Sequence, residues 1–231
     1  MTTLHCPNTI SVLPPSNILS KSASIYQYTH IAVSALIMAF DDAKAKRGKP
    51  RGVLTDQEQD ILRAALVMSC AGVDAVLKQT IRDTIEPLLE KDQSVRDGFE
   101  RFIHKRINGE SDAIELYSGA KFLASVLADR EPRRRLIEDY IKDLTGDSLQ
   151  SAEEILRTAA ALGVDNKVVK IDIPRLKEIF TIRNKIIHEL DIDLSAYARK
   201  RRVRSQADLL DSADTVLDTV RRVVEAVGTR L

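Results

Sequence analysis

The stretch EQDILRAALVMSCAGVDAVLKQTIRDTIEPLLEK, residues 58–91, decides the fold class. Its apolar residues recur at three- and four-residue intervals, which is the periodicity of a buried helical face. Just before it, TDQE at 55–58 has the pattern of a capping box, in which Thr55 and Glu58 bind each other's backbone amides. We therefore expect a long core helix here, with Pro87 kinking or ending it. Its apolar positions are Ile61, Leu62, Ala65, Leu66, Met68, Val73, Val76, Leu77, Ile81 and Ile85.

Helical patterns on both sides of this segment predict an all-α protein. A second capping box, Ser151 with Glu154, marks a helix start, and Pro174 suits the first position of another helix. Residues 162–173 break the pattern, and their β-branched run VVKIDI suits a short extended segment. The further helices are expected at about 24–46, 93–107, 111–128, 133–145, 151–162, 174–190 and 206–227.

The organisation along the chain indicates one domain behind an irregular arm. Residues 1–22 hold three prolines and several Ser, Thr and Asn residues, which is typical of irregular structure. Residues 23–231 form a single all-α domain in this interpretation, and 93–145 is a candidate helical insertion.

Composition supports the same class. Aromatic residues make up only 4 % of the 231 residues and Trp is absent, so Leu, Ile, Val and Ala must fill the core. With 9 Gly and 7 Pro, a turn-rich β fold is not expected. The net charge of +1 excludes a polybasic nucleic-acid coat, so an anionic partner must be bound locally.

The sequence also predicts a compartment. Two cysteines, Cys6 and Cys70, give no disulfide framework, which favours a reducing environment. The first residues lack the pattern of a signal peptide, and the apolar run at 31–40 is too short to cross a bilayer. We therefore expect a cytoplasmic protein with no membrane association.

A second stretch, FTIRNKIIHEL at 180–190, places an arginine on an apolar helical face. On a helical wheel of about 100° per residue, Arg183 lies at the centre of the apolar arc, and Asn184 and His188 lie at its edge. A buried guanidinium is costly unless something pairs with it. A carboxylate such as Asp74, a bound anion, or a polar cleft at a subunit boundary would each compensate. The apolar arc consists of Leu176, Ile179, Phe180, Ile182, Ile186, Ile187 and Leu190.

The residues RNKIIHEL resemble the Arg-Asn-x-x-x-His signature of HEPN domains (higher eukaryotes and prokaryotes nucleotide-binding). Four residues separate Arg183 from His188, and the family allows four to six. The segment LRAALVMSCAGVDAVLKQTIRD also looks like the early helix of larger bacterial HEPN proteins, in which an acidic residue accompanies the motif. The resemblance covers about 55–90 and 174–227, and it implies a HEPN-like helical bundle with additional inserted helices.

This resemblance implies an endoribonuclease that needs no metal and no cofactor. In RNA the 2′-hydroxyl is the nucleophile beside the phosphate. His188 would transfer protons, Arg183 would bind the scissile phosphate, and Asn184 would orient His188 or the ribose. Asp74 would support them. Family members commonly form homodimers in which two motifs face one cleft, which supplies both an acid and a base. Many act as toxins or anti-phage defence effectors restrained by an antitoxin or a regulatory partner.

Other interpretations remain open at this point. A non-catalytic HEPN module would use Arg183 to hold a nucleotide or a partner protein. A helical scaffold with a coincidental motif would pair Arg183 with Asp74. The basic run RKRRVR is either a solvated connector or an RNA-binding element, in which Arg199, Lys200, Arg201, Arg202 and Arg204 contact the phosphate backbone. The histidines show no metal-ligand spacing with the cysteines; they are His5, His30, His104 and His188.

Overall fold

The core helix α2 (Asp56–Lys91) forms as predicted and organises the fold of this computed structural model, which describes residues 2–11, 17–47, 52–108 and 113–231. Its capping box is confirmed: the Glu58 amide donates to Thr55 Oγ1 at 3.2 Å, and the Thr55 amide donates to Glu58 Oε2 at 2.8 Å. Pro87 was expected to kink or end the helix, but α2 continues to Lys91. Burial of Leu88 and Leu89, beyond the proline, accounts for the continuation.

The all-α class is confirmed. Within the described ranges the only β pairing is an isolated bridge between Ile192 and Arg201. The other elements are η1 (Asn17–Leu19), α1 (Ser20–Lys46), α3 (Gln93–Asn108), α4 (Ala113–Leu127), α5 (Pro132–Thr145), α6 (Ala152–Ala161), α7 (Asn166–Val169), α8 (Ile173–Glu189) and α9 (Gln206–Gly228).

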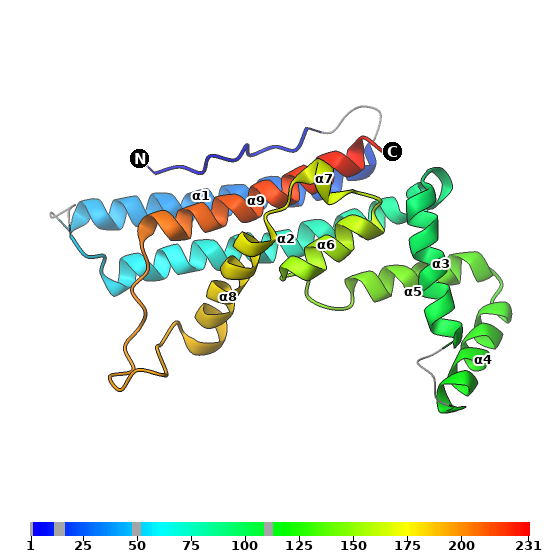
Figure 1. Cartoon of the computed structure of the whole chain (residues 1–231). Helices are drawn as coiled ribbons and strands as arrows, with labels where there is room; N and C mark the ends of the chain where they lie inside the picture. The colour runs from blue at the N-terminus through cyan, green and yellow to red at the C-terminus, as the bar shows by residue number, and fades with distance from the viewer. Residues whose placement is uncertain (1, 12–16, 48–51, 109–112) are drawn as a thin grey trace.

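Helices α1, α2 and α9 run side by side as the long bundle that holds most of the core (Figure 1). Val216, Val220, Val223 and Val227 on α9 are fully buried, because their three- and four-residue spacing forms one apolar face. Helices α1 and α2 lie close together at Gly72. A Cβ atom at that position would lie 2.1 Å from Thr29 Cγ2, so only glycine fits there.

Helices α3, α4 and α5 extend beyond one end of this bundle (Figure 1). Three aromatic rings join α3 to α5: the Phe102 and Tyr140 centroids are 5.1 Å apart, and those of Phe99 and Tyr140 are 5.3 Å apart. These helices belong to the candidate insertion at 93–145. The expected start of α4, at 111–112, lies outside the described residues.

The β-branched run after α6 is partly helical rather than extended. Asp165 caps the short helix α7 by accepting from the Lys167 amide at 2.8 Å, and Lys170 ends it in a left-handed conformation at φ 50°. Local capping by an Asp side chain therefore overrides the β propensity of the valines.

Residues 2–11 form an irregular arm that is anchored to two helices, but the irregular arm predicted for residues 1–22 is too long, because η1 begins at Asn17 and α1 at Ser20. The amides of His5 and Cys6 both donate to Asp214 of α9, at 2.7 and 2.8 Å. The Ser11 amide donates to Glu225 at 2.9 Å, and Tyr26 Oη donates to the Pro7 carbonyl at 2.7 Å. The arm thus lies along α1 and α9 (Figure 1).

Helix α1 is the one helix among the described residues whose length and composition would allow it to cross a membrane. It carries no charged side chain from Ser22 to Phe40, a longer uncharged stretch than the run at 31–40 suggested. Tyr26, Val33, Ile37 and Phe40 of this helix are buried against the bundle, and 33 % of its most apolar window is buried.

Candidate functional site

The helix that carries the Arg-Asn-x-x-x-His motif, α8, has two unlike halves. Asp172 caps it by accepting from the Arg175 amide at 3.0 Å, and its first half is anchored in the core by Leu176, Ile179 and Phe180. From Thr181 onward no residue of α8 is fully buried. Figure 1 shows α8 inclined to the long bundle, with the loop after it lying away from the other helices. The motif therefore lies on an accessible half-helix with a rigid base.

Arg183 is half-buried on α8, and no described carboxylate lies within ion-pairing distance of it. Its Nη1 donates to Asn184 Oδ1 at 2.9 Å, while its Nε is buried and has no hydrogen-bond partner. Burial raises the pKa of the Cys70 thiol on α2 to about 12, and the positive charge of Arg183 opposes that rise. The guanidinium thus faces α2 with an unsatisfied donor.

Asn184 and His188 are both exposed. Asn184 binds Arg183, so in this structure it holds the guanidinium rather than His188. Five residues along a helix correspond to a rotation of about 140° and a rise of about 7.5 Å, so Arg183 and His188 of one chain lie on different sides of α8. A single chain therefore does not bring these two side chains together.

Asp74 does not pair with Arg183. Its Oδ1 accepts from the Leu149 amide at 2.7 Å, and its Oδ2 lies 3.0 Å from Lys78 Nζ. These partners join α2 to the segment before α6, so the carboxylate is used in helix packing. The interpretation of an Arg183–Asp74 ion pair is wrong for this structure, and Asp74 does not support the motif by direct contact.

The basic segment after α8 divides into two groups. Arg201, Arg202 and Arg204 are bound to carboxylates: Arg201 to Asp60, Arg202 to Glu189 and Asp193, and Arg204 to Asp191. The hydrogen bond from Arg201 holds the pKa of Asp60 below its ordinary value. Arg199 and Lys200 are exposed, and neither has a carboxylate within 4.0 Å among the described residues. Of the five predicted RNA-binding cations, these two are the ones left unpaired.

A buried ionic cluster beneath this segment was not predicted from the sequence. Asp191 is fully buried and accepts from Arg63 Nε at 3.0 Å and from Arg204 Nε and Nη2 at 2.9 and 2.7 Å. Arg63, on α2, also donates to the Arg202 carbonyl at 2.7 Å. The cluster fixes the end of α8 to the starts of α2 and α9. The available signal was Arg63 beside Leu62 within the apolar pattern of α2.

The remaining candidates have ordinary structural roles. His30 lies 3.1 Å from the Cys6 carbonyl oxygen, and His104 is exposed on α3. Cys70 is a buried core residue, as expected. No group of three or more His, Cys, Asp or Glu side chains suited to a metal ion occurs within the part of the chain that the structure describes.

Comparison of the chain with protein-family models, with curated proteins and with solved structures gave no significant match.

Proposed function

We propose that the chain is a metal-independent endoribonuclease of the HEPN type, acting as a homodimer in the cytoplasm. The single observation that carries this proposal is Arg183: a guanidinium on an accessible half-helix, with no carboxylate partner among the described residues and with a buried Nε that none of them satisfies. An unpaired buried donor carries a free-energy cost, and an anion bound there would remove it.

The proposed chemistry assigns a role to each motif residue. Arg183 binds the scissile phosphate and stabilises the charge that develops on it, because its planar fork matches phosphate oxygens and keeps its charge. His188 removes the proton from the 2′-hydroxyl or donates one to the leaving 5′-oxygen. Asn184 keeps the Arg183 guanidinium oriented through its 2.9 Å hydrogen bond.

A second copy of the chain is part of the proposal. One His188 does not readily serve as base and acid in the same step, and in one chain it lies on a different side of α8 from Arg183. Exposed apolar side chains lie within the motif and just after it, Ile187 at 40 % and Leu190 at 64 % exposure, and they suit burial between two copies. Two such half-helices would supply two histidines and two arginines.

The test is cleavage of total RNA by purified protein in the presence of a chelator. The wild type is expected to leave 2′,3′-cyclic phosphate ends, and Arg183→Ala and His188→Ala are each expected to lose cleavage by at least about 100-fold. His104→Ala is the matched control, because this exposed histidine lies on α3 and is expected to retain full activity. Loss of wild-type cleavage on addition of EDTA would contradict the metal-free mechanism.

The same variants test the biological role, a toxin or anti-phage effector held in check by an antitoxin or regulatory partner. Expression of the wild type is expected to arrest growth, and His188→Ala is expected to relieve the arrest at equal protein level. If phosphate or a nucleotide raises the melting temperature but no RNA is cleaved, the chain is instead a non-catalytic HEPN module.

A further inference from the structure

The loop between α8 and α9 has a tip whose shape is fixed by hydrogen bonds among its own residues. The Ser195 amide and hydroxyl both donate to Asp193 Oδ1, at 3.1 and 2.6 Å. The Asp193 amide donates to the Lys200 carbonyl at 2.9 Å, which closes the base of the tip. Arg199 adopts a left-handed conformation at φ 44°, and its amide donates to the Ala196 carbonyl at 3.0 Å. These hydrogen bonds give the tip a defined shape.

Below the tip, ion pairs attach the loop to the rest of the fold. Arg202 lies 3.3 Å from Glu189 at the end of α8, and Arg201 lies 2.6 Å from Asp60 at the start of α2. These contacts, together with the buried Asp191 cluster, hold the loop next to the motif-bearing half of α8. Tyr197 follows His188 by nine positions, so their α-carbons lie within about 30 Å of each other.

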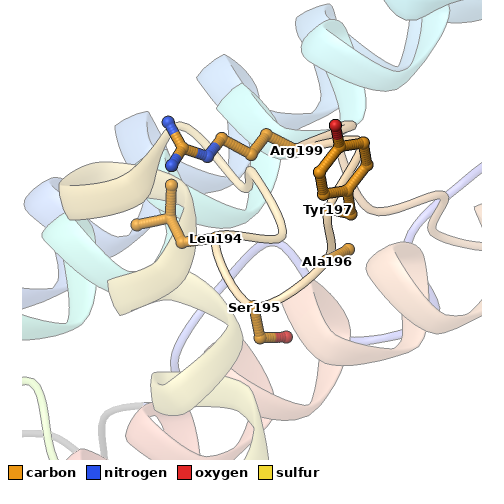
Figure 2. A pocket seen from close by; sticks show the side chains of 5 residues that line it. All are labelled: Leu194, Ser195, Ala196, Tyr197 and Arg199. Atoms are coloured by element: carbon orange, nitrogen blue, oxygen red, sulfur yellow. The ribbon is translucent and has the colours of Figure 1, made fainter.

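The tip presents an aromatic ring and a cation to solvent. The Tyr197 side chain is completely exposed, at 106 % of the reference area, and Leu194 is 61 % exposed. Figure 2 shows the Tyr197 ring at one side of the loop. The Arg199 side chain extends from the loop in the opposite direction, toward Leu194. These residues line a hollow of about 560 Å³ together with Ser195 and Ala196. The Tyr197 ring therefore does not contribute to the core of its own chain.

We propose that this tip, residues 194–199, binds an unpaired base of single-stranded RNA, with Tyr197 stacking on the base and Arg199 contacting an adjacent phosphate. The inference deepens the proposed function and rests on RNA being the substrate. Aromatic side chains stack on bases without sequence preference, and arginine adds a phosphate contact. A base within a duplex offers no free face, so the tip selects single-stranded over double-stranded RNA.

The absence of tryptophan from the chain provides a direct test, because Tyr197→Trp introduces a single fluorescent reporter at the tip. In a His188→Ala background, which prevents cleavage, a single-stranded 12-nucleotide RNA of mixed sequence is expected to quench this fluorescence. The same RNA annealed to its complement is expected to leave it unchanged. Tyr28→Trp, on α1, is the matched control: Tyr28 is 73 % exposed, and its replacement is expected to show no quenching.

Affinity measurements complete the test. In the same background Tyr197→Ala is expected to weaken binding of the single-stranded RNA by about 5- to 150-fold, and Tyr197→Phe to retain wild-type affinity. Equal quenching of the two tryptophan variants, or wild-type affinity in Tyr197→Ala, overturns the proposal. A change in the protein's association state in Tyr197→Ala, with RNA affinity intact, assigns the tip to a protein contact and also overturns it.

The outcomes also separate this inference from the ribonuclease proposal. If the tip variants bind RNA as expected but the wild type cleaves nothing, the tip is an RNA-binding element and the catalytic proposal fails. If the wild type cleaves RNA and Tyr197→Ala binds and cleaves as well as the wild type, the catalytic proposal stands and the assignment of the tip fails.

Discussion

Arg63 and Asp191 lie 128 positions apart in the sequence and form a buried ion pair, with Arg63 Nε 3.0 Å from Asp191 Oδ2. Their side chains are 3 % and 0 % exposed. Arg204 approaches the same carboxylate from just before α9, so Asp191 binds two arginines at the junction of three helices, and Asp60 lies 3.0 Å from Arg63 as a second carboxylate.

Replacing this acid is expected to destabilise the fold strongly. Asp191→Asn removes the carboxylate that pairs with Arg204 and leaves Arg63 with only the more exposed Asp60, at a cost of about 3–5 kcal/mol in the free energy of unfolding, measured by urea denaturation. Asparagine tolerates the left-handed backbone found there, φ 56°, so the loss reports the charge and not the backbone. Asp139→Asn, in the exposed pair with Arg135, is the control and is expected to cost less than about 1 kcal/mol. Equal losses of unfolding free energy in Asp191→Asn and Asp139→Asn would contradict the assignment of Asp191 as the buried counter-charge.

Substitution of the two core-facing arginines, Arg63 and Arg183, is expected to change the free energy of unfolding by very different amounts. Arg63→Met breaks the buried cluster and is expected to cost about 3–5 kcal/mol. Arg183→Met removes a guanidinium that pairs with no carboxylate in the described part of the chain, and it is expected to change stability by less than about 1 kcal/mol. Urea denaturation of both variants under the same conditions is the measurement. A large loss in Arg183→Met would assign Arg183 a structural role and weaken the functional one.

The close approach of α1 and α2 predicts a steric effect. Gly72→Ala places a Cβ atom 2.1 Å from Thr29 Cγ2, so the helices must separate, at a cost of about 1–3 kcal/mol. Adding Thr29→Ala is expected to recover part of this loss, because it removes the two nearest atoms. Gly98→Ala on α3, where the nearest atom is Tyr140 Oη at 3.2 Å, is the control and is expected to be close to neutral. The melting temperatures of the three variants, measured by thermal unfolding, test whether the contact with Thr29 causes the loss of stability.

Stability is expected to fall at high pH because of the buried thiol on α2. Burial raises the pKa of Cys70 from 9.0 to about 12, so the folded state keeps its proton where the unfolded state loses it. The contribution is fully present below pH 9 and is lost as the pH rises toward 12, with a limiting slope of about 1.4 kcal/mol per pH unit for one thiol. Urea denaturation at pH 8 and pH 10.5 measures the decline, and Cys70→Ala is expected to make it shallower. An unchanged slope in that variant would exclude the thiol as a cause.

The elements that could be predicted from the sequence are those whose causes are local. The capping box at Thr55 and Glu58 and the apolar period that follows it lie within a few residues of each other, so α2 and its start were predictable. Pro87 illustrates the limit. Its effect on the helix depends on whether the residues beyond it find a core to fill, and that is a property of the whole bundle.

The site was only partly predictable for the same reason. The helical wheel predicts that Arg183 faces inward on α8, and the half-buried side chain agrees. Arg63 on α2 pairs instead with a fully buried carboxylate, Asp191, which lies on a loop 128 positions later in the sequence. Asp74 interrupts an apolar stretch, which suggested a functional role. Its carboxylate instead accepts a hydrogen bond from the Leu149 amide, 75 positions later in the sequence. A helical wheel identifies which face of a helix is buried, but it does not identify the side chain from elsewhere in the fold that contacts that face.

The arm at residues 2–11 has a consequence for synthesis. The Cys6 amide binds a carboxylate 208 positions later in the chain. At ordinary rates of translation, its acceptor is made about 10–40 seconds after it. During that interval the arm has no docking site on α9, and the buried face of α1 on which it also lies stays partly uncovered. The arm and this face of α1 are therefore open to proteases and to premature association until α9 has left the ribosome.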